Sequence, residues 1–170
     1  MTAPWSAAVA VVDALQQAGA TVGAAESLTG GLVTAELTAV PGASAVVRGG
    51  VVVYATDLKT TLGGVPAEVL DQDGPVAAST AAALAAGARD RCHATYGVAT
   101  TGVAGPDPQD GHPPGTLHVA VAGPEGTRVA SVTGLRGDRA AVRQQAVRHA
   151  LDLLLAVITE ARESPTLSER

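Results

Sequence analysis

The sequence predicts an α/β fold, a three-layer α/β/α sandwich around a mixed, mostly parallel β-sheet. Two observations favour this class. Short β-branched runs alternate with longer segments of helical periodicity, and two strand-like runs then follow each other across a tight turn. The length of 170 residues and the 46% hydrophobic content suit one domain with a sizeable core.

The first half of the chain alternates helix and strand. Pro4 suits the first turn of the opening helix, and Pro41-Gly42 ends the next one. The predicted elements are a helix over residues 4–18, a strand over 21–25, a helix over 32–40, a buried strand over 51–54, and helical turns over 57–62 and 66–70.

The second half continues the alternation and then adds a strand pair. The predicted elements are an Ala-rich helix over 75–91, a strand over 96–101, a Gly/Pro-rich loop over 102–115, strands over 116–122 and 127–133, and a helix over 138–158. The sequence Gly123-Pro124-Glu125-Gly126 marks the turn between the paired strands. We therefore expect a single domain over residues 1–159 and a polar, flexible tail over 160–170.

Composition excludes several classes of protein. The 11 basic and 16 acidic residues give a net charge of −5, which disfavours direct binding of nucleic acid or an anionic membrane. A single cysteine, Cys92, permits no internal disulfide and no multi-cysteine metal site. No apolar run reaches ~18 residues, and the first residues lack a basic secretory start. We expect a cytoplasmic protein with no metal and no cofactor.

Lys59 is the only lysine, because the other ten basic residues are arginine. An ammonium group can lose its proton when it is desolvated, whereas a guanidinium cannot at accessible pH. Two explanations of this composition are equally good: the lysine is retained for its chemistry, or a GC-rich codon bias has favoured arginine elsewhere.

Ser27 lies between a predicted strand and the next helix, in the motif Ala25-Glu26-Ser27-Leu28-Thr29-Gly30-Gly31. A serine there could be a nucleophile, with the amides of the glycine turn stabilising an oxyanion. Helix capping by Ser27 or Thr29 is the alternative.

Tyr54 and Lys59 bracket the end of the next strand, near the sheet edge where α/β folds bind ligands. A desolvated lysine could serve as the base for a serine, and a tyrosine could relay the proton. The alternative is a solvated lysine beside a half-buried tyrosine.

Two further motifs suit a ligand. Thr101 and Gly102 follow a strand and open a Gly/Pro-rich loop whose hydroxyls and exposed amides suit a carboxamide, ribose or phosphate; a loop without a ligand is the alternative. Arg139 and Arg143 lie four residues apart on the last helix, behind a cap at Asp138. They could clamp a phosphate or form an ordinary solvated face.

These motifs, in this order, resemble the CinA C-terminal domain family, the nicotinamide-nucleotide amidases. The matching stretches are AESLTGG (25–31), YATDLK (54–59), TGVAGPDP (101–108), PPGT (113–116) and GDRAAVRQQA (137–146), and together they cover most of the chain from residue 5 to 158. The resemblance implies a stand-alone form of this domain, without the N-terminal domain that larger CinA proteins carry.

The resemblance implies metal-independent hydrolysis of the carboxamide of nicotinamide mononucleotide to nicotinate mononucleotide and ammonia, in pyridine nucleotide salvage. It implies Ser27 as nucleophile with Tyr54 and Lys59 as activating partners, and it makes a homo-oligomer an expectation. We expect the following residues to bind substrate: Thr29, Gly30, Gly31, Thr101, Gly102, Arg139 and Arg143.

The chain departs from the family pattern at three positions. Family members often carry cysteine where this chain has Leu28. The family commonly has serine where this chain has Thr101 and Ala77, so one hydroxyl is kept and one is lost. A catalytically weak or inactive nucleotide-binding module is therefore the alternative function. The family's competence/damage name suggests a role in DNA uptake or repair, for which the acidic composition offers no support.

Overall fold

A five-stranded sheet forms the centre of the structure, a computed structural model that describes residues 5–163. The strand order is β2-β1-β3-β4-β5, with β1 parallel to β2 and to β3, and β4 antiparallel to β3 and to β5. The sheet is therefore mixed, and every strand except β4 runs in the same direction. The strands are β1 (Val22–Glu26), β2 (Val47–Val52), β3 (Tyr96–Val103), β4 (Thr116–Gly123) and β5 (Gly126–Val132).

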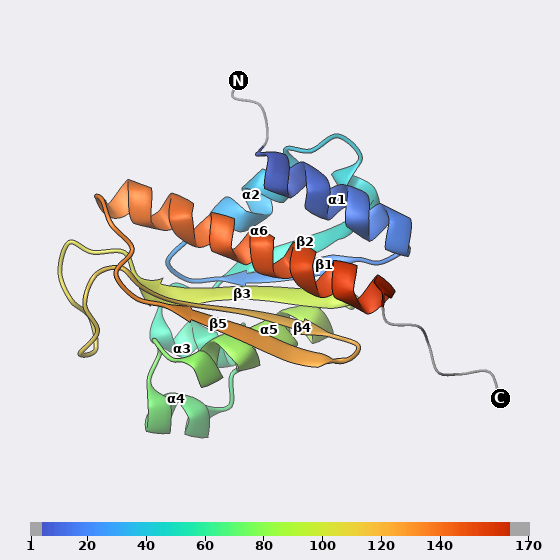
Figure 1. The fold of residues 1–170 in the computed structure, drawn as a ribbon. Helices are drawn as coiled ribbons and strands as arrows, with labels where there is room; N and C mark the ends of the chain where they lie inside the picture. The colour runs from blue at the N-terminus through green and yellow to red at the C-terminus, as the bar shows by residue number, and fades with distance from the viewer. Residues whose placement is uncertain (1–4, 164–170) are drawn as a thin grey trace.

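Helices cover both faces of this sheet, which confirms the three-layer sandwich (Figure 1). One layer contains α1 (Ser6–Ala18), α2 (Leu32–Thr38) and α6 (Arg139–Glu163). The other contains α3 (Thr56–Thr61), α4 (Ala67–Asp73) and α5 (Ala78–Arg91), and a short 3-10 helix, η1 (Ala43–Ala45), precedes β2.

Two separate hydrophobic clusters hold the layers together, one on each face of the sheet. The larger joins α1 and α6 to the sheet through residues such as Leu15, Val119 and Leu154. The smaller joins α5 through Leu84 and neighbouring alanines, whose small side chains let the helix approach the strands closely.

Strand β2 differs from the prediction of a buried strand over residues 51–54. It begins at Val47 and lies at the edge of the sheet, where its residues alternate between half-buried and exposed. Pairing with β1 accommodates Gly49 and Gly50, which intrinsic strand propensity disfavours. A Cβ at Gly50 would lie 2.4 Å from the Thr34 hydroxyl, so close packing of α2 explains this glycine.

The last helix also differs from its predicted end at residue 158, because α6 continues to Glu163. Side chains of the added turn have partners in the fold. Glu160 pairs with Arg128 on β5, and Arg162 donates a 3.0 Å hydrogen bond to Gln17 on α1. Residues 160–163 therefore belong to the helix rather than to the predicted tail. The rest of that tail, 164–170, and Pro4 lie outside the described residues.

The turn and cap predictions are confirmed. Pro124 and Glu125 form the turn between β4 and β5. At the start of α6, the Asp138 carboxylate accepts a 2.8 Å hydrogen bond from the Ala141 amide. Over residues 5–163, no helix has the length and apolar content needed to cross a membrane.

Candidate active site

The carboxyl ends of β1, β2 and β3 meet at one edge of the sheet, and a cavity of about 90 Å³ opens there. It is lined by Ser27 after β1, by Tyr54 and Lys59 after β2, and by residues of β3 and the following loop. Arg139, the first residue of α6, also lines it. The predicted site residues that line the cavity are Ser27, Tyr54, Lys59, Thr101, Gly102 and Arg139.

Ser27 and Lys59 are in direct contact. The Lys59 Nζ lies 3.1 Å from the Ser27 Oγ. Lys59 is 2% exposed and Ser27 is 7% exposed, so this contact is shielded from bulk water. The alternative of a solvated lysine is therefore wrong. Capping by Ser27 is also wrong, because the N-cap of α2 is Gly31, without a side-chain cap bond.

Two backbone carbonyls orient the Lys59 side chain. Its Nζ lies 3.0 Å from the Val53 oxygen and 3.3 Å from the Tyr54 oxygen. A neutral amine has two N–H donors and one lone pair. With both donors directed to these carbonyls, the lone pair faces the third neighbour, the Ser27 hydroxyl.

The surroundings of Lys59 favour that neutral form. Burial lowers the pKa of the Lys59 ammonium from its ordinary value, and the Asp110 carboxylate partly offsets this effect. The local fold therefore provides an amine that can accept a proton beside a serine.

The Tyr54 side chain lies at the mouth of the cavity and is 57% exposed. Its hydroxyl accepts a 2.5 Å hydrogen bond from Arg139, whose other terminal nitrogen donates to the Gly105 carbonyl at 2.9 Å. Arg139 thus joins Tyr54 to the loop after β3. Lys59 contacts Tyr54 through the tyrosine backbone oxygen. The direct route for a proton from Ser27 to Lys59 is therefore the one with a short side-chain contact.

The turn after Ser27 leaves two amide groups without an acceptor. Among residues 27–35 as the structure describes them, every backbone N–H has a protein acceptor except those of Leu28 and Thr29. Both residues are buried, at 4% and 0% exposure. Buried N–H groups without an acceptor are rare in folded proteins, which makes this adjacent pair a candidate for holding a negative charge.

Glu26 organises the same turn from inside the protein. The side chain is 1% exposed and accepts five hydrogen bonds of 2.7–3.0 Å. The donors are the Thr29 hydroxyl, the amides of Gly31 and Val33, and the amide and hydroxyl of Thr34. Sequence reasoning gave Glu26 no role, although a carboxylate at the end of a buried strand and before a helix N-terminus is a detectable signal.

Four predicted substrate ligands, Thr29, Gly30, Gly31 and Arg143, are not among the residues that line the cavity. The Thr29 hydroxyl contacts Glu26 and Thr100, at 2.7 and 2.8 Å. The amides of Gly30 and Gly31 donate to the Ser27 carbonyl and to Glu26, so they are already occupied. The fourth, Arg143, donates to backbone carbonyls of the turn.

Thr101 lines the cavity, and its hydroxyl donates a 2.6 Å hydrogen bond to the Pro75 carbonyl. The hydroxyl kept at this position therefore ties β3 to the segment before α5. Ala77, where the family commonly has serine, is the N-cap of α5 and makes no side-chain cap bond.

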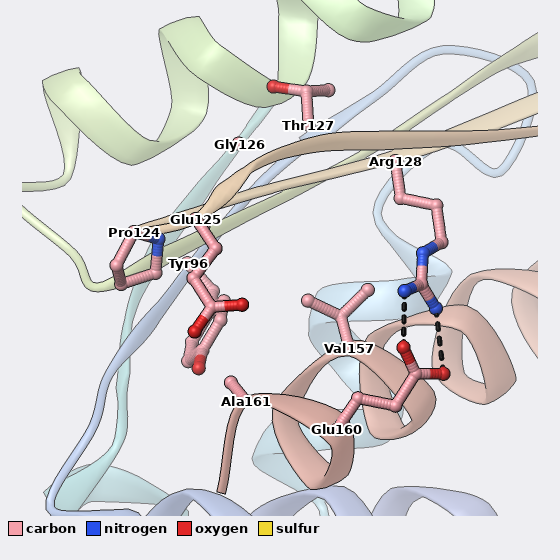
Figure 2. Close-up of a pocket in the computed structure, with 10 residues that line it drawn as sticks. Tyr96, Pro124, Glu125, Gly126, Thr127, Arg128, Val157, Glu160 and Ala161 are labelled. Atoms are coloured by element: carbon pink, nitrogen blue, oxygen red, sulfur yellow. Dashed lines mark hydrogen bonds and ion pairs between the residues drawn. The ribbon is translucent and has the colours of Figure 1, made fainter. Parts of the chain in front are cut away.

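A second cavity, of about 240 Å³, lies at the opposite end of the sheet (Figure 2). Tyr96, Glu125 and the Arg128–Glu160 ion pair surround it. The described part of its lining contains no serine, lysine or histidine. The smaller cavity is therefore the better candidate for covalent chemistry, although it is not the larger of the two.

Comparison with known proteins identifies the family of this chain. The sequence profile described as "CinA C-terminal domain" matches residues 5–158. The chain belongs to the CinA C-terminal domain family. A CinA-like protein from Frankia casuarinae is 55% identical over 144 residues, which are 85% of this chain and 33% of that protein. A CinA-like protein from Myxococcus xanthus is 42% identical over 93% of this chain and 38% of its own length. The chain thus spans about a third of the length of these curated CinA relatives.

Solved structures of CinA proteins share the fold. The competence/damage inducible protein CihA from Agrobacterium tumefaciens aligns with a TM-score of 0.85 and 34% identity over 92% of this chain and 98% of its own. A CinA superfamily protein from Escherichia coli aligns with a TM-score of 0.86 and 29% identity over 92% of this chain and 90% of its own. These names describe competence or damage induction and give no reaction.

Proposed function

We propose that this CinA domain is a metal-independent amidase that hydrolyses the carboxamide of nicotinamide mononucleotide to nicotinate mononucleotide and ammonia. The contact between a buried Lys59 amine and the Ser27 hydroxyl, 3.1 Å apart, carries the reaction type. The substrate is proposed from the resemblance of the sequence motifs to the nicotinamide-nucleotide amidases.

Ser27 is the proposed nucleophile and Lys59 its base. The neutral Lys59 amine takes the Ser27 proton while the Ser27 oxygen forms a bond to the carboxamide carbon. The C–N bond then breaks, and the leaving nitrogen receives that proton from Lys59 and departs as ammonia. Water attacks the resulting ester by the same proton route, which releases the carboxylic acid and restores Ser27.

The amides of Leu28 and Thr29 are the proposed donors to the oxyanion that forms during attack. The sequence pointed to amides between Thr29 and Gly31, or at Thr101-Gly102. The amides of Gly30 and Gly31 already donate to other acceptors, so we assign the oxyanion donors to residues nearer Ser27 in the sequence. Preorganised donors of this kind cost no reorganisation at the moment of reaction.

The size of the cavity favours the reacting group over the whole nucleotide. Pockets that bury a drug-sized ligand measure roughly 300–1,000 Å³, whereas this one measures about 90 Å³. We propose that the carboxamide enters the cavity and that the ribose phosphate stays at the mouth. Tyr54 and Arg139 lie there, and we propose that the Arg139 guanidinium binds the phosphate.

Ammonia release from nicotinamide mononucleotide, measured with EDTA present, tests the proposal. Wild type should turn over, and Ser27→Ala should lose activity by about 10³-fold or more while it stays folded. Ser44→Ala, which changes an exposed serine in η1, is the matched control and should retain full activity. Saturable nucleotide binding without turnover by wild type would instead support the non-catalytic binding module.

A further inference from the structure

Arg143 reaches from α6 to the turn that carries the nucleophile. Its Nε donates to the Leu28 carbonyl at 3.0 Å, and one terminal nitrogen donates to the Thr29 carbonyl at 2.9 Å. The guanidinium fork therefore holds two consecutive peptide groups from the side away from the cavity, which Arg143 does not line.

The direction of these carbonyls determines the direction of the free amides. In a trans peptide group, the C=O of one residue and the N–H of the next point in opposite directions. Because Arg143 holds the Leu28 carbonyl, the Thr29 N–H points away from Arg143. The Thr29 carbonyl is held in the same way, which orients the Gly30 N–H toward the Ser27 carbonyl, 3.0 Å away.

Glu26 holds the same segment from the other end. It accepts hydrogen bonds from the Thr29 hydroxyl and from the amides that follow Gly30. The turn is thus held by an anion on its helix side and by a cation on its carbonyl side. The two amides left over are those of Leu28 and Thr29, directly after Ser27.

We infer that Arg143 is a positioning residue for the reaction at Ser27. Through the Leu28 carbonyl it aims the Thr29 amide at the developing oxyanion. Through the Thr29 carbonyl it directs the Gly30 amide to the Ser27 carbonyl, which in turn orients the Leu28 amide. This inference rests on the proposed function. It replaces the expectation that Arg143 binds the substrate phosphate, because its guanidinium donates to two backbone oxygens of the turn.

The two roles separate in steady-state kinetics. A residue that aims oxyanion donors changes kcat and leaves KM for nicotinamide mononucleotide nearly unchanged. Loss of a residue that binds the substrate phosphate instead raises KM more than it lowers kcat. Arg143→Met keeps an unbranched apolar stem and removes both donors, so it should lower kcat by about 10- to 100-fold.

A second measurement does not depend on the natural substrate. A fluorophosphonate forms a bond to the Ser27 oxygen with loss of fluoride, and its phosphoryl oxygen gains negative charge as this occurs. Arg143→Met should slow the labelling of Ser27, followed by mass spectrometry, by a similar factor. Arg143→Lys can reach one carbonyl and should give an intermediate rate.

Arg148→Met is the matched control. Arg148 lies on the same helix and is exposed, and its side chain makes no hydrogen bond to the described residues, so both rates should equal those of wild type. A higher KM with an unchanged kcat in Arg143→Met would overturn the positioning role, and so would a lower Tm with both rates unchanged. If wild type itself neither releases ammonia nor takes up the label, the proposed function fails first and the inference falls with it.

Discussion

Replacement of Lys59 by methionine removes the one amine that the described structure places against the Ser27 hydroxyl. Methionine has a similar length and no charge, so it fills the buried site without a proton acceptor. A general base contributes about 10²- to 10⁴-fold to a rate, which corresponds to roughly 3–5 kcal/mol at about 1.4 kcal/mol per tenfold. We expect kcat/KM to fall by that factor.

The same substitution changes the free energy of unfolding through two opposing effects. The carbonyls of Val53 and Tyr54 lose a donor, at about 1–3 kcal/mol for each group left unsatisfied. The variant no longer buries an amine, which favours folding and opposes that loss. Loss of activity in a folded protein is therefore the expected outcome.

The pH dependence provides the sharper test. Burial lowers the pKa of Lys59 from 10.5, so the neutral base forms below that pH. The wild-type kcat/KM should rise with pH and level off with a midpoint below 10.5. In the same window the unfolded chain holds a proton that the folded protein lacks, so wild-type stability should also rise with pH. The stability that depressed Lys59 contributes is complete above 10.5 and is lost as pH falls through the folded pKa.

Ammonia release between pH 5 and 10 measures the rates, and urea unfolding over the same range measures stability. The Lys59→Met variant should lack the rising limb of the rate and the matching slope of the free energy of unfolding. A variant that kept more than a tenth of wild-type kcat/KM, or the same pH profile, would refute Lys59 as the base.

Three further predictions concern the free energy of unfolding. Ala77→Ser should stabilise the fold by about 0.5–1 kcal/mol, since residue 77 is an extended N-cap without a cap bond; an unchanged urea midpoint would show that the hydroxyl does not reach the first turn of α5. Gly87→Ala should lower the free energy of unfolding by about 1–3 kcal/mol despite its better helix propensity, because the new Cβ would lie 1.8 Å from the Gly63 carbonyl oxygen; a raised Tm would contradict this. Glu26→Gln should cost about 2–5 kcal/mol in urea unfolding, because its amide nitrogen would face buried donors. Its control, Glu36→Gln on α2, loses one 3.4 Å contact and should change by less than about 0.5 kcal/mol, so equal losses would contradict the argument.

The order of the elements, the layers and the Ser27–Lys59 pair at the centre of the site can be predicted from the amino-acid sequence alone. Hydrophobic periodicity and turn residues are local, so the helices, the β4–β5 turn and the Asp138 cap follow from short stretches of chain. Ser27 and Lys59 were identifiable because each follows a predicted strand, and parallel strands bring their carboxyl ends together.

The roles of the remaining polar groups depend on contacts that form only in the folded chain. Arg139 and Arg143 are equivalent in sequence, four residues apart on one helix, yet one reaches the cavity mouth and the other the back of the Ser27 turn. Whether a buried donor or acceptor is satisfied depends on partners more than 100 residues away, as for Arg143 and Leu28. Local pattern carries no information on such partners, so the two free amides emerged only from the folded chain. Glu26 differs, because its partners lie within eight residues of it and its place before a helix N-terminus is visible in the sequence.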